Sequence, residues 1–381
     1  MKTIDIIGAG IGGLTLAIAL KQKGFAVRVF EQAPELRAVG AGINLACNAM
    51  QVYDGLGLRQ AIEDAGHICH QMQVTDETLQ SLSEIDITPF SKRFAVHNVA
   101  IHRAALQKTL RSYLSDDEVF LGKELKHIEH WGNITRLHFT DGTQYGSQCV
   151  VGADGIGSTV RRQWLGEGEI RSSDQLCWRG VAEFELPAPY GDQLTEAWGA
   201  AGRFGFVQVD AKRVYWFAVM RKSTLPETTD KQFLISVYQD FNHLVTQLLC
   251  ATPEEGIHEA PLGDLVAPSC WYRDSVCLIG DAAHATTPNL GQGACQAIED
   301  AWVLAHCLEK NDIHEEAFQQ FQAIRQHKVK QVVTASWSVG QMAHWQNPLA
   351  IRFRNGLMRI MPKRLGERQS ESLYTLEELT V

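Results

Sequence analysis

The stretch Gly8-Ala9-Gly10-Ile11-Gly12-Gly13 decides the fold of the N-terminal part of this chain. An apolar run typical of a buried strand precedes it, and apolar residues at helical spacing follow it as far as Leu20. Gly8 permits a tight turn, Gly10 lets a phosphate group approach the backbone, and Gly13 allows the helix to pack closely. The order of strand, glycine turn and helix predicts a Rossmann-like unit whose helix N-terminus faces a pyrophosphate.

A second apolar run, Ala26 to Phe30, reads as the next strand and ends at Glu31. An acidic residue about 20 positions after the glycine turn is where a ribose hydroxyl is bound in dinucleotide-binding folds. We therefore expect Glu31 and the adjacent Gln32 to lie against a ribose. Because a carboxylate disfavours a 2′-phosphate at this place, FAD or NAD fits better than NADP.

Two further motifs each close an apolar, strand-like run. They are Gly152-Ala153-Asp154-Gly155 and Leu278-Ile279-Gly280-Asp281-Ala282-Ala283-His284. An aspartate in such a place is commonly a turn or N-cap residue, which is the structural alternative for both Asp154 and Asp281. His284 is expected to be a packed or hydrogen-bonded histidine rather than an acid or base. Two such motifs after buried strands favour a shared ligand over two unrelated turns.

In order and spacing, the three motifs resemble those of the group A, single-component FAD-dependent aromatic hydroxylases, which include salicylate hydroxylase-like and urate hydroxylase-like members. Residues 150–161 are similar to that family's DG motif, and residues 278–294 are similar to its GD motif. The resemblance spans about residues 4–305. It implies bound FAD, with NADH or NADPH as co-substrate and no separate nicotinamide domain.

The resemblance also implies where FAD is held. Asp281 would bond the ribityl chain, and Arg103 would lie near the phosphates, although a solvated arginine at a helix end is the alternative. A helix expected over 295–308 would present its positive end to the reduced flavin. The residues implied to contact the cofactor are Gly8, Gly10, Gly13, Glu31, Gln32, Gly42, Ile43, Arg103, Leu125, Asp154, Asp281, Pro288, Gly291, Gly293 and Ala294.

The segments that resemble an FAD-binding domain are interrupted by segments rich in β-type runs, such as 203–209 and 213–220, and by one helical pattern over 231–249. We therefore predict an α/β fold with interleaved domains. A discontinuous Rossmann-like FAD-binding domain is expected at 1–71, 97–171 and 270–340, a β-sheet substrate domain at 72–96 and 172–269, and a C-terminal helical segment at 341–381.

Two candidate catalytic residues, Arg203 and Tyr215, lie on strand-like runs where alternate residues share a face. In urate hydroxylase-like relatives an arginine and a tyrosine at matching places meet the substrate. The guanidinium offers two directed donors, and the tyrosine would orient or deprotonate a hydroxyl. The alternative is a surface arginine and a core tyrosine. Those relatives carry an aspartate where this chain has Asn289, and because an amide cannot act as a carboxylate base, urate itself is in doubt.

Aromatic residues on the same runs leave the class of substrate ring open. Phe204, Phe206, Trp216 and Phe217 suggest an apolar aromatic site, although aromatic residues on strands more often belong to a core.

The function implied by the resemblance is a monooxygenase that uses NAD(P)H and O₂ to hydroxylate or epoxidise a small aromatic or conjugated molecule through a flavin hydroperoxide. Alternatives are an FAD-dependent reductase or dehydrogenase without oxygen transfer, and a flavin-bearing interaction module. For the latter, a helix over 349–361 would dock through Arg352, Arg354 and Arg359. We favour packing of this helix on the FAD-binding domain with solvated charges, and contact with a membrane surface is the weaker alternative.

Composition narrows the class of partner. A net charge of −9 over 381 residues gives no electrostatic footprint for nucleic acid. Nine cysteines without CxxC spacing predict neither a disulfide framework nor a metal site. The chain enters a strand at once, without a secretory signal pattern, and has no apolar run of about 18 residues, so we expect a cytoplasmic protein. The sequence leaves open whether it is a monomer or a homodimer.

Overall fold

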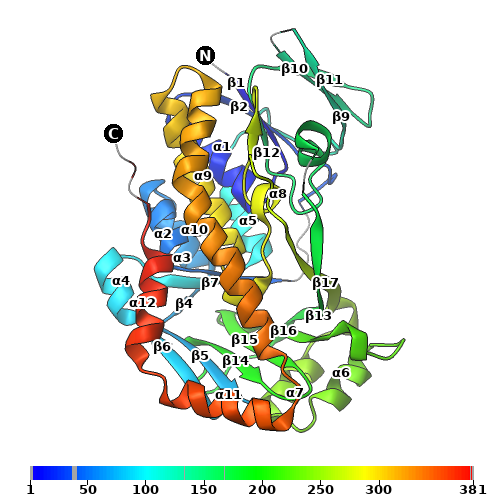
Figure 1. Cartoon of the computed structure of the whole chain (residues 1–381), viewed down its shortest axis with the longest axis vertical. Coiled ribbons are helices and arrows are strands. Elements are labelled where there is room, and N and C mark those ends of the chain that lie inside the picture. The colour runs from blue at the N-terminus through cyan, green and yellow to red at the C-terminus, as the bar shows by residue number, and fades with distance from the viewer. Residues whose placement is uncertain (1–2, 37–40, 133, 167, 378, 380–381) are drawn as a thin grey trace.

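The computed structural model describes residues 3–36, 41–132, 134–166, 168–377 and 379. Two larger β-sheets lie toward opposite ends of an elongated molecule, and the long helix α10 (His314–Ala343) runs from one toward the other (Figure 1). The expected α/β fold with a Rossmann-like unit, a second sheet and C-terminal helices is confirmed.

The six-stranded sheet contains the three sequence motifs. Its neighbouring strands are parallel except at the β18–β19 hairpin. Apart from the edge strand β18, the strands are largely buried apolar runs, as is typical of parallel sheets covered on both faces. Its order is β18 (Tyr272–Arg273), β19 (Val276–Leu278), β12 (Val150–Gly152), β1 (Thr3–Ile7), β2 (Ala26–Phe30) and β8 (Val119–Phe120).

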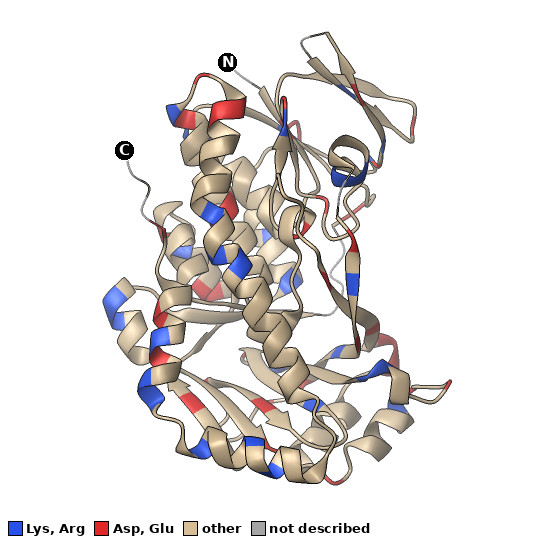
Figure 2. Cartoon of the chain, in the orientation of Figure 1, with Lys and Arg blue, Asp and Glu red and all other residues tan. Residues whose placement is uncertain are grey.

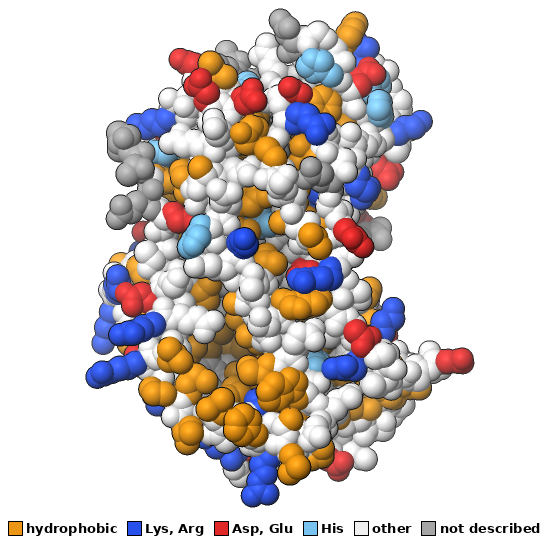
Figure 3. Space-filling model, in the orientation of Figure 1, with side chains coloured by type: hydrophobic (Ala, Val, Ile, Leu, Met, Phe, Trp, Pro, Cys, Tyr) orange, Lys and Arg blue, Asp and Glu red, His pale blue; other side chains and the backbone are white. Residues whose placement is uncertain are grey.

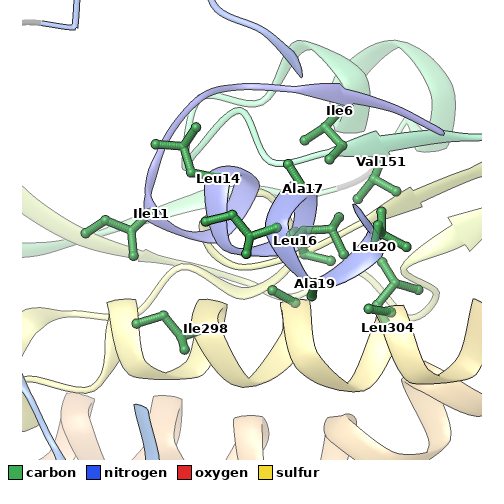
Figure 4. Packing of buried hydrophobic residues seen from close by; sticks show 14 of the residues in the cluster. Ile6, Ile11, Leu14, Leu16, Ala17, Ala19, Leu20, Val151, Ile298 and Leu304 are labelled. Carbon is green, nitrogen blue, oxygen red and sulfur yellow. The ribbon is translucent and has the colours of Figure 1, made fainter. Parts of the chain in front are cut away.

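Helix α1 (Ile11–Gln22) is buried between this sheet and helix α9 (Gly293–Lys310). Figure 4 shows Ile11 and Ala19 of α1 facing Ile298 and Leu304 of α9, with Ile6 and Val151 of the sheet on the other side. Because α1 has apolar neighbours on two sides, nine of its twelve residues are buried and it lacks a polar face.

The seven-stranded sheet is mainly antiparallel and has two different faces. One face packs Trp178, Phe204, Phe206 and Trp216 against helices α6 (Lys231–Val237) and α7 (His243–Ala251). Its order is β17 (His258–Leu265), β13 (Ile170–Glu183), β16 (Arg213–Arg221), β15 (Arg203–Asp210), β14 (Gln193–Trp198), β5 (Gln71–Asp76) and β6 (Ser81–Asp86).

The helical pattern expected over 231–249 is divided into two helices. Asp230 caps α6 by accepting a hydrogen bond from Phe233 N, and Asn242 caps α7 by accepting one from Leu244 N. Because Asn242 binds backbone groups outside a helix, it starts a new helix rather than continuing the first.

Two small sheets and several helices complete the fold around the six-stranded sheet. The first small sheet has the order β3, β7, β4 and the second has the order β11, β10, β9. These elements are β3 (Gly42–Leu45), β7 (Asn98–His102), β4 (His67–Cys69), β11 (Gln144–Ser147), β10 (Ile134–Phe139), β9 (Leu125–Trp131), α2 (Cys47–Gly55), α3 (Arg59–Ala65), α4 (Thr88–Phe94), α5 (Arg103–Arg111) and α8 (Asp281–His284).

The chain ends in helices α11 (Pro348–Ile360) and α12 (Lys363–Tyr374). Helix α11 lies across the seven-stranded sheet near β6, and α12 passes β6 toward α2 (Figure 1). The expected packing of this helix on the FAD-binding segments is therefore wrong for α11. Arg354 explains the difference, because its guanidinium is buried, donates hydrogen bonds to Met342 O and Ala343 O, and lies over the Trp198 ring.

A buried charge network joins α9 to α10. Arg325 of α10 donates to Asp300 Oδ1 at 2.8 Å and to Glu299 Oε2 at 2.7 Å, and Lys328 also pairs with Glu299. The imidazole of His284 lies 2.6 Å from Asp300 Oδ2, so His284 is the hydrogen-bonded structural histidine that the sequence predicts. Each buried charge has a partner of opposite sign, which offsets its loss of hydration.

Within the described part of the chain, the helices that reach 18 residues lack the sustained apolar stretch that crossing a bilayer requires.

Candidate active site

A cavity of about 450 Å³ lies between the six-stranded and seven-stranded sheets, and both contribute to its wall. The glycine turn, α5 and the N-terminus of α9 form one side, and one face of the seven-stranded sheet forms the other. Of the residues predicted from the sequence, the cavity is lined by Gly10, Gly42, Ile43, Arg103, Arg203, Tyr215, Asp281, Pro288, Gly291, Gly293 and Ala294.

The three predicted glycines of the first motif occupy three different environments. Gly8 has a φ of +106° and a Cβ there would lie 2.4 Å from Ala153 O, so the turn requires glycine. A Cβ at Gly13 would lie 2.1 Å from Gly8 O, which is the close helix packing that the motif predicts. Gly10 is different, because it lines the cavity and a Cβ there would meet no atom within 4 Å. The open space beside Gly10 fits a ligand at the N-terminus of α1.

Glu31 follows β2 and folds back over the glycine turn. Its Oε2 accepts a hydrogen bond from Ala9 N at 2.8 Å, and its Oε1 accepts one from Ala33 N at 3.0 Å. Gln32 is exposed, and Leu125 is buried in the core at the start of β9, so neither lines the cavity. The backbone near Leu125 nevertheless runs beside Glu31, because Lys123 N donates to Glu31 O at 2.7 Å.

Asp154 acts within its own turn. Its Oδ2 accepts hydrogen bonds from Thr159 N at 2.7 Å and Val160 N at 3.1 Å, which is the structural alternative considered from the sequence. Burial raises the pKa of the Asp154 carboxyl, and these hydrogen bonds oppose that shift. The neighbouring Gly155 and Ile156 line the cavity, so the turn that Asp154 holds forms part of the wall.

Asp281 differs from Asp154 because its carboxylate faces the cavity. Among the residues that the structure describes, none donates a hydrogen bond to it. Desolvation by the surrounding protein raises the pKa of Asp281, while the nearby His284 and Arg103 lower it. Asp281 is accessible from the cavity, and an acceptor without a protein partner there is suited to a hydroxyl-bearing ligand.

Backbone groups beside Asp281 complete this end of the cavity. Gly291, with a φ of +63°, turns the chain into α9, whose first residues Gly293 and Ala294 line the cavity. The first N–H groups of an α-helix have no partner within the helix, and they carry partial positive charge. This end therefore favours an electron-rich or anionic ligand.

Arg103 begins α5, on the same side of the cavity as the glycine turn. His102 caps the helix through Nδ1, which accepts a hydrogen bond from Ala104 N, and Arg103 N donates to Ala41 O at 2.9 Å. In the described part of the chain no carboxylate forms an ion pair with Arg103. Its charge is thus directed to the cavity without a protein counter-ion.

Alternate residues of the seven-stranded sheet face the cavity, as the strand spacing predicts. Arg203 comes from β15, and Tyr215 and Phe217 come from β16. Phe204, Phe206 and Trp216 point into the core on the other face, so of these aromatic residues only Phe217 lines the cavity. The suggestion that all four form an aromatic site is wrong, because residues adjacent on a strand point to opposite faces.

Arg203 is held by two neighbours in the cavity wall. Its Nη1 lies 3.0 Å from Glu196 Oε1 on β14, and its Nη2 donates to Asn289 Oδ1 at 2.6 Å. Its Nε is buried without a protein partner. Glu196 balances the charge of Arg203, so Arg203 adds little net charge to the cavity.

Asn289 is fixed in the orientation that Arg203 requires. Its Nδ2 donates to Ser336 O and to Thr287 Oγ1, both at 2.9 Å. Because Ser336 O accepts hydrogen bonds only, the amide nitrogen must face it and the amide oxygen must face Arg203. An aspartate has no donor for Ser336 O when ionised, which accounts for an amide at this position.

Tyr215 lies between the two halves of the cavity. A Cβ at Gly42 would lie 2.4 Å from the Tyr215 ring, so β3 packs directly on that ring. Burial raises the pKa of the Tyr215 phenol, with the Cys177 thiol acting in the same direction. A phenol that stays protonated donates a hydrogen bond, so orientation of a substrate is favoured over its deprotonation.

Sequence reasoning missed two charged residues in the cavity, Glu196 and Arg179. Arg179 lies on β13 near Cys177 and Tyr215, and no described acidic residue forms an ion pair with it. Both residues belong to strands in which alternate positions face the cavity, so a period-two pattern was available. Their approach to Arg203 and Tyr215 depends on strand order and register, which that pattern does not contain.

The cavity suits FAD, because Gly10 leaves open space, Asp281 offers a free acceptor and Arg103 offers a free cation. Fold and site thus define a flavin-dependent enzyme in which a second sheet forms one wall of the cavity. Comparison with known families agrees, since residues 1–336 match the family described as "FAD binding domain". The chain belongs to this family and is an FAD-dependent monooxygenase of the aromatic hydroxylase group.

Similar proteins cover nearly the whole chain. The aurachin C monooxygenase/isomerase of Stigmatella aurantiaca is 35% identical over 94% of each chain. The 2-heptyl-3-hydroxy-4(1H)-quinolone synthase of Pseudomonas aeruginosa is 32% identical over 98% of each chain. The crystal structure of Klebsiella pneumoniae HpxO with FAD and uric acid superposes with a TM-score of 0.89 at 26% identity, over 98% of this chain and 96% of that one.

Proposed function

We propose that FAD lies along the cavity from Glu31 to the N-terminus of α9. The adenosine end meets Glu31, the pyrophosphate meets Gly10 and the N-terminus of α1, and the ribityl chain meets Asp281. This proposal is supported by the open space at Gly10 and by the unpartnered carboxylate of Asp281. Arg103 is positioned to balance phosphate charge, and Gly293 and Ala294 offer backbone N–H groups to the ring.

The remaining predicted contacts follow the same path. Gly8 and Gly13 shape the turn, Asp154 holds the adjoining turn, and Gly42 and Ile43 border the ring end of the groove. Strands β5, β6 and β13–β17, from residues 71–86 and 170–265, are proposed as the substrate-binding domain, and the interleaved segments as the FAD-binding domain.

The substrate that fits best is an uncharged nitrogen heteroaromatic ring of the 4-quinolone or quinoline type with an alkyl side chain. The observation that carries this proposal is the Glu196–Arg203–Asn289 arrangement, in which the arginine already has an anionic partner. An anionic ring would have to compete with Glu196, which is half-buried and already paired with Arg203. Two relatives of more than 30% identity are named for aurachin C and for a heptyl hydroxyquinolone, which supports the same class.

The apolar part of the wall provides for the alkyl side chain. Leu194, Val207, Phe217, Val219 and Leu262 line the cavity on the seven-stranded sheet. Burial of a chain of several methylene groups stabilises the complex by about 0.8 kcal/mol for each group. Urate lacks such a chain, so this surface gives it no corresponding contact.

The overall reaction is a balanced monooxygenation. The ring C–H, O₂, NAD(P)H and a proton give the ring C–OH, H₂O and NAD(P)⁺. When bound, FAD takes two electrons from the nicotinamide and activates O₂ for transfer of one oxygen atom. The protein binds and orients the ring, and it excludes water from the cavity.

Polar residues of this chain raise the reactivity of the ring. Oxygen transfer to a carbon conjugated with the ring nitrogen places positive charge on that nitrogen. Glu196, as an acceptor for the ring N–H, stabilises this charge and so raises the reactivity of the ring. Tyr215 and Arg179 orient the ring by donating to its carbonyl. Arg203 forms part of the cavity wall and keeps the Glu196 carboxylate in place.

The test measures NADH and NADPH oxidation, oxygen uptake and peroxide release together, with purified protein and four compounds. These are 2-heptyl-4(1H)-quinolone, unsubstituted 4-quinolone, urate and 3-amino-4-hydroxybenzoate. We expect the heptyl quinolone to stimulate oxidation and suppress peroxide, with a higher KM for the unsubstituted ring. Coupled turnover of urate or the benzoate, without turnover of either quinolone, would contradict the substrate class. Nicotinamide oxidation that never consumes oxygen would contradict monooxygenation itself.

A further inference from the structure

Helix α11 presents a row of apolar side chains to solvent. Leu349 is 78% exposed, Phe353 is 68% exposed and Ile360 is 77% exposed, and Leu357 and Leu365 are also exposed. The spacing of four, four, three and five residues keeps the first four on one side of α11 and continues into α12. We call these five residues the α11 apolar face. In Figure 3, hydrophobic side chains gather on the lower part of the molecule, where Figure 1 places α11.

Hydrogen bonds and an ion pair fix the orientation of α11, and therefore of its apolar face. At the start of the helix, Asn347 caps α11 by accepting hydrogen bonds from Leu349 N and Ala350 N. Arg354 is buried, and Arg359 pairs with Asp76 of β5 at 2.8 Å. These contacts fix which side of the helix faces the seven-stranded sheet, so the exposed side is the apolar one.

Positive charge surrounds the α11 apolar face although the whole chain is acidic. Residues 345–368 contain six Lys or Arg residues and one Glu, in a chain whose net charge is −9. Arg352, Arg364 and Arg368 are exposed, and among the described residues they form no ion pair. Figure 2 shows basic residues along α11 and α12 at the lower edge of the molecule.

We propose that this surface docks on an anionic lipid bilayer, with α11 lying in the plane of the interface. An exposed apolar face bordered by Lys and Arg is the arrangement by which interfacial helices bind headgroups and acyl chains together. A second copy of the chain fits less well, because a twofold interface places the same patch on both subunits and brings the basic borders together.

The docked surface adjoins the active-site cavity. A Cβ at Gly340 of α10 would lie 2.3 Å from Asn289 Nδ2, and His344 Nε2 lies 3.4 Å from Val219 O. Asn289 and Val219 both line the cavity, and α11 begins four residues after His344. A hollow lined by Arg221, His344, Trp345, Gln346, Asn347 and Ala350 lies at the same corner. Docking therefore brings the substrate-binding side of the enzyme to the lipid surface, whatever the ring it accepts.

The experiment is co-sedimentation of the intact, FAD-loaded protein with vesicles of phosphatidylcholine alone and of phosphatidylcholine with about 30% phosphatidylglycerol. We expect partitioning on the anionic vesicles that falls as salt rises. The double variant Leu349→Ser/Phe353→Ser should bind at least about tenfold more weakly. The triple variant Arg352→Gln/Arg364→Gln/Arg368→Gln should lose about a hundredfold on anionic vesicles.

Ile313→Ser provides the matched control, because Ile313 is similarly exposed but lies at the far end of α10. It should bind vesicles like the wild type. Thermal unfolding and FAD absorbance of each variant separate loss of binding from loss of fold. Equal partitioning of wild type and the Leu349→Ser/Phe353→Ser variant would overturn the proposal. So would absence of vesicle binding together with a dimer, seen by light scattering, that the same variant abolishes.

Discussion

The two sheets that enclose the cavity are built in different ways. In the six-stranded sheet each ligand-facing group lies in a short motif directly after a strand, as with Gly10 after β1 and Asp281 after β19. In the seven-stranded sheet the cavity face is assembled from residues on five strands, as with Glu196 and Arg203, which meet through pairing of β14 with β15. In the first sheet, residues close together in sequence form the site. In the second sheet, the pairing and register of the strands bring distant residues together.

The largest effect is expected from breaking the packing of the local motif. Gly13→Ala places a Cβ 2.1 Å from the carbonyl oxygen of Gly8, and a backbone atom cannot move aside without displacing α1. We expect loss of FAD and a decrease of about 3 kcal/mol or more in the free energy of unfolding. Gly10→Ala is the matched variant, because its Cβ meets no protein atom. It should weaken FAD binding while urea denaturation stays near wild type, and equal destabilisation by both variants would contradict these assignments.

The next effect concerns the charge network behind the six-stranded sheet. Asp300→Asn should cost about 3 to 5 kcal/mol, because Arg325 and His284 lose a buried anionic partner. Burial by itself would raise the pKa of Asp300, but His284 and Arg325 together lower it to about 2. Its contribution to stability is therefore complete above the unfolded pKa of about 3.9 and is lost as pH falls toward 2.

Urea denaturation of the wild type and Asp300→Asn at several pH values tests that sign. The difference between the two proteins should be constant from pH 5 to 7 and should shrink below about pH 4. A difference that grows as the solution is acidified would contradict the network described here.

A smaller effect is expected from changing residues of the seven-stranded sheet that line the cavity. Arg203→Ala removes the cation that fixes the Glu196 carboxylate, so kcat/KM should fall about 10- to 100-fold while FAD stays bound. Peroxide release per nicotinamide oxidised should rise. Arg213→Ala, on the neighbouring strand, removes only a partly exposed ion pair with Asp210 and should leave kinetics unchanged. Identical kinetics for the two variants would remove Arg203 from the site.

The smallest effect is expected at Tyr215. Because burial raises its pKa, the phenol stays protonated through neutral and moderately alkaline pH. Tyr215→Phe removes one hydrogen bond to a neutral group, so kcat/KM should fall about tenfold without a change in the shape of its pH profile between pH 6 and 9. Disappearance of an ionisation from that profile would instead assign Tyr215 as a base.

These differences also explain which elements and site residues could be predicted from the sequence. The second strand was predicted with its observed bounds, Ala26–Phe30, because strand, turn and helix signals are adjacent along the chain. Arg203 and Tyr215 were placed on the cavity face because strand alternation is local. Glu196 was not found, since its approach to Arg203 depends on which strands pair.

For helix α11 too, the sequence predicts the element but not the side on which it packs. Its existence and bounds near 349–361 were predicted well from apolar spacing and Pro362. The side on which it packs was not, because Arg354 is buried and Phe353 is exposed, contrary to their hydropathy. Arginine is usually exposed, but the Arg354 guanidinium is buried because it binds two carbonyl oxygens and packs on an aromatic ring.

Helix α10 fixes the distance between the two ends of the molecule that enclose the cavity. Its 30 residues span about 45 Å without interruption, with Arg325 bound to the α9 carboxylates and Gly340 pressed against Asn289. Insertion of a single residue between these two anchors would turn one relative to the other by about 100°, so both could not be satisfied together. Insertions and deletions should therefore be tolerated in the loops around the cavity. Within α10, between Arg325 and Gly340, they should destabilise the fold.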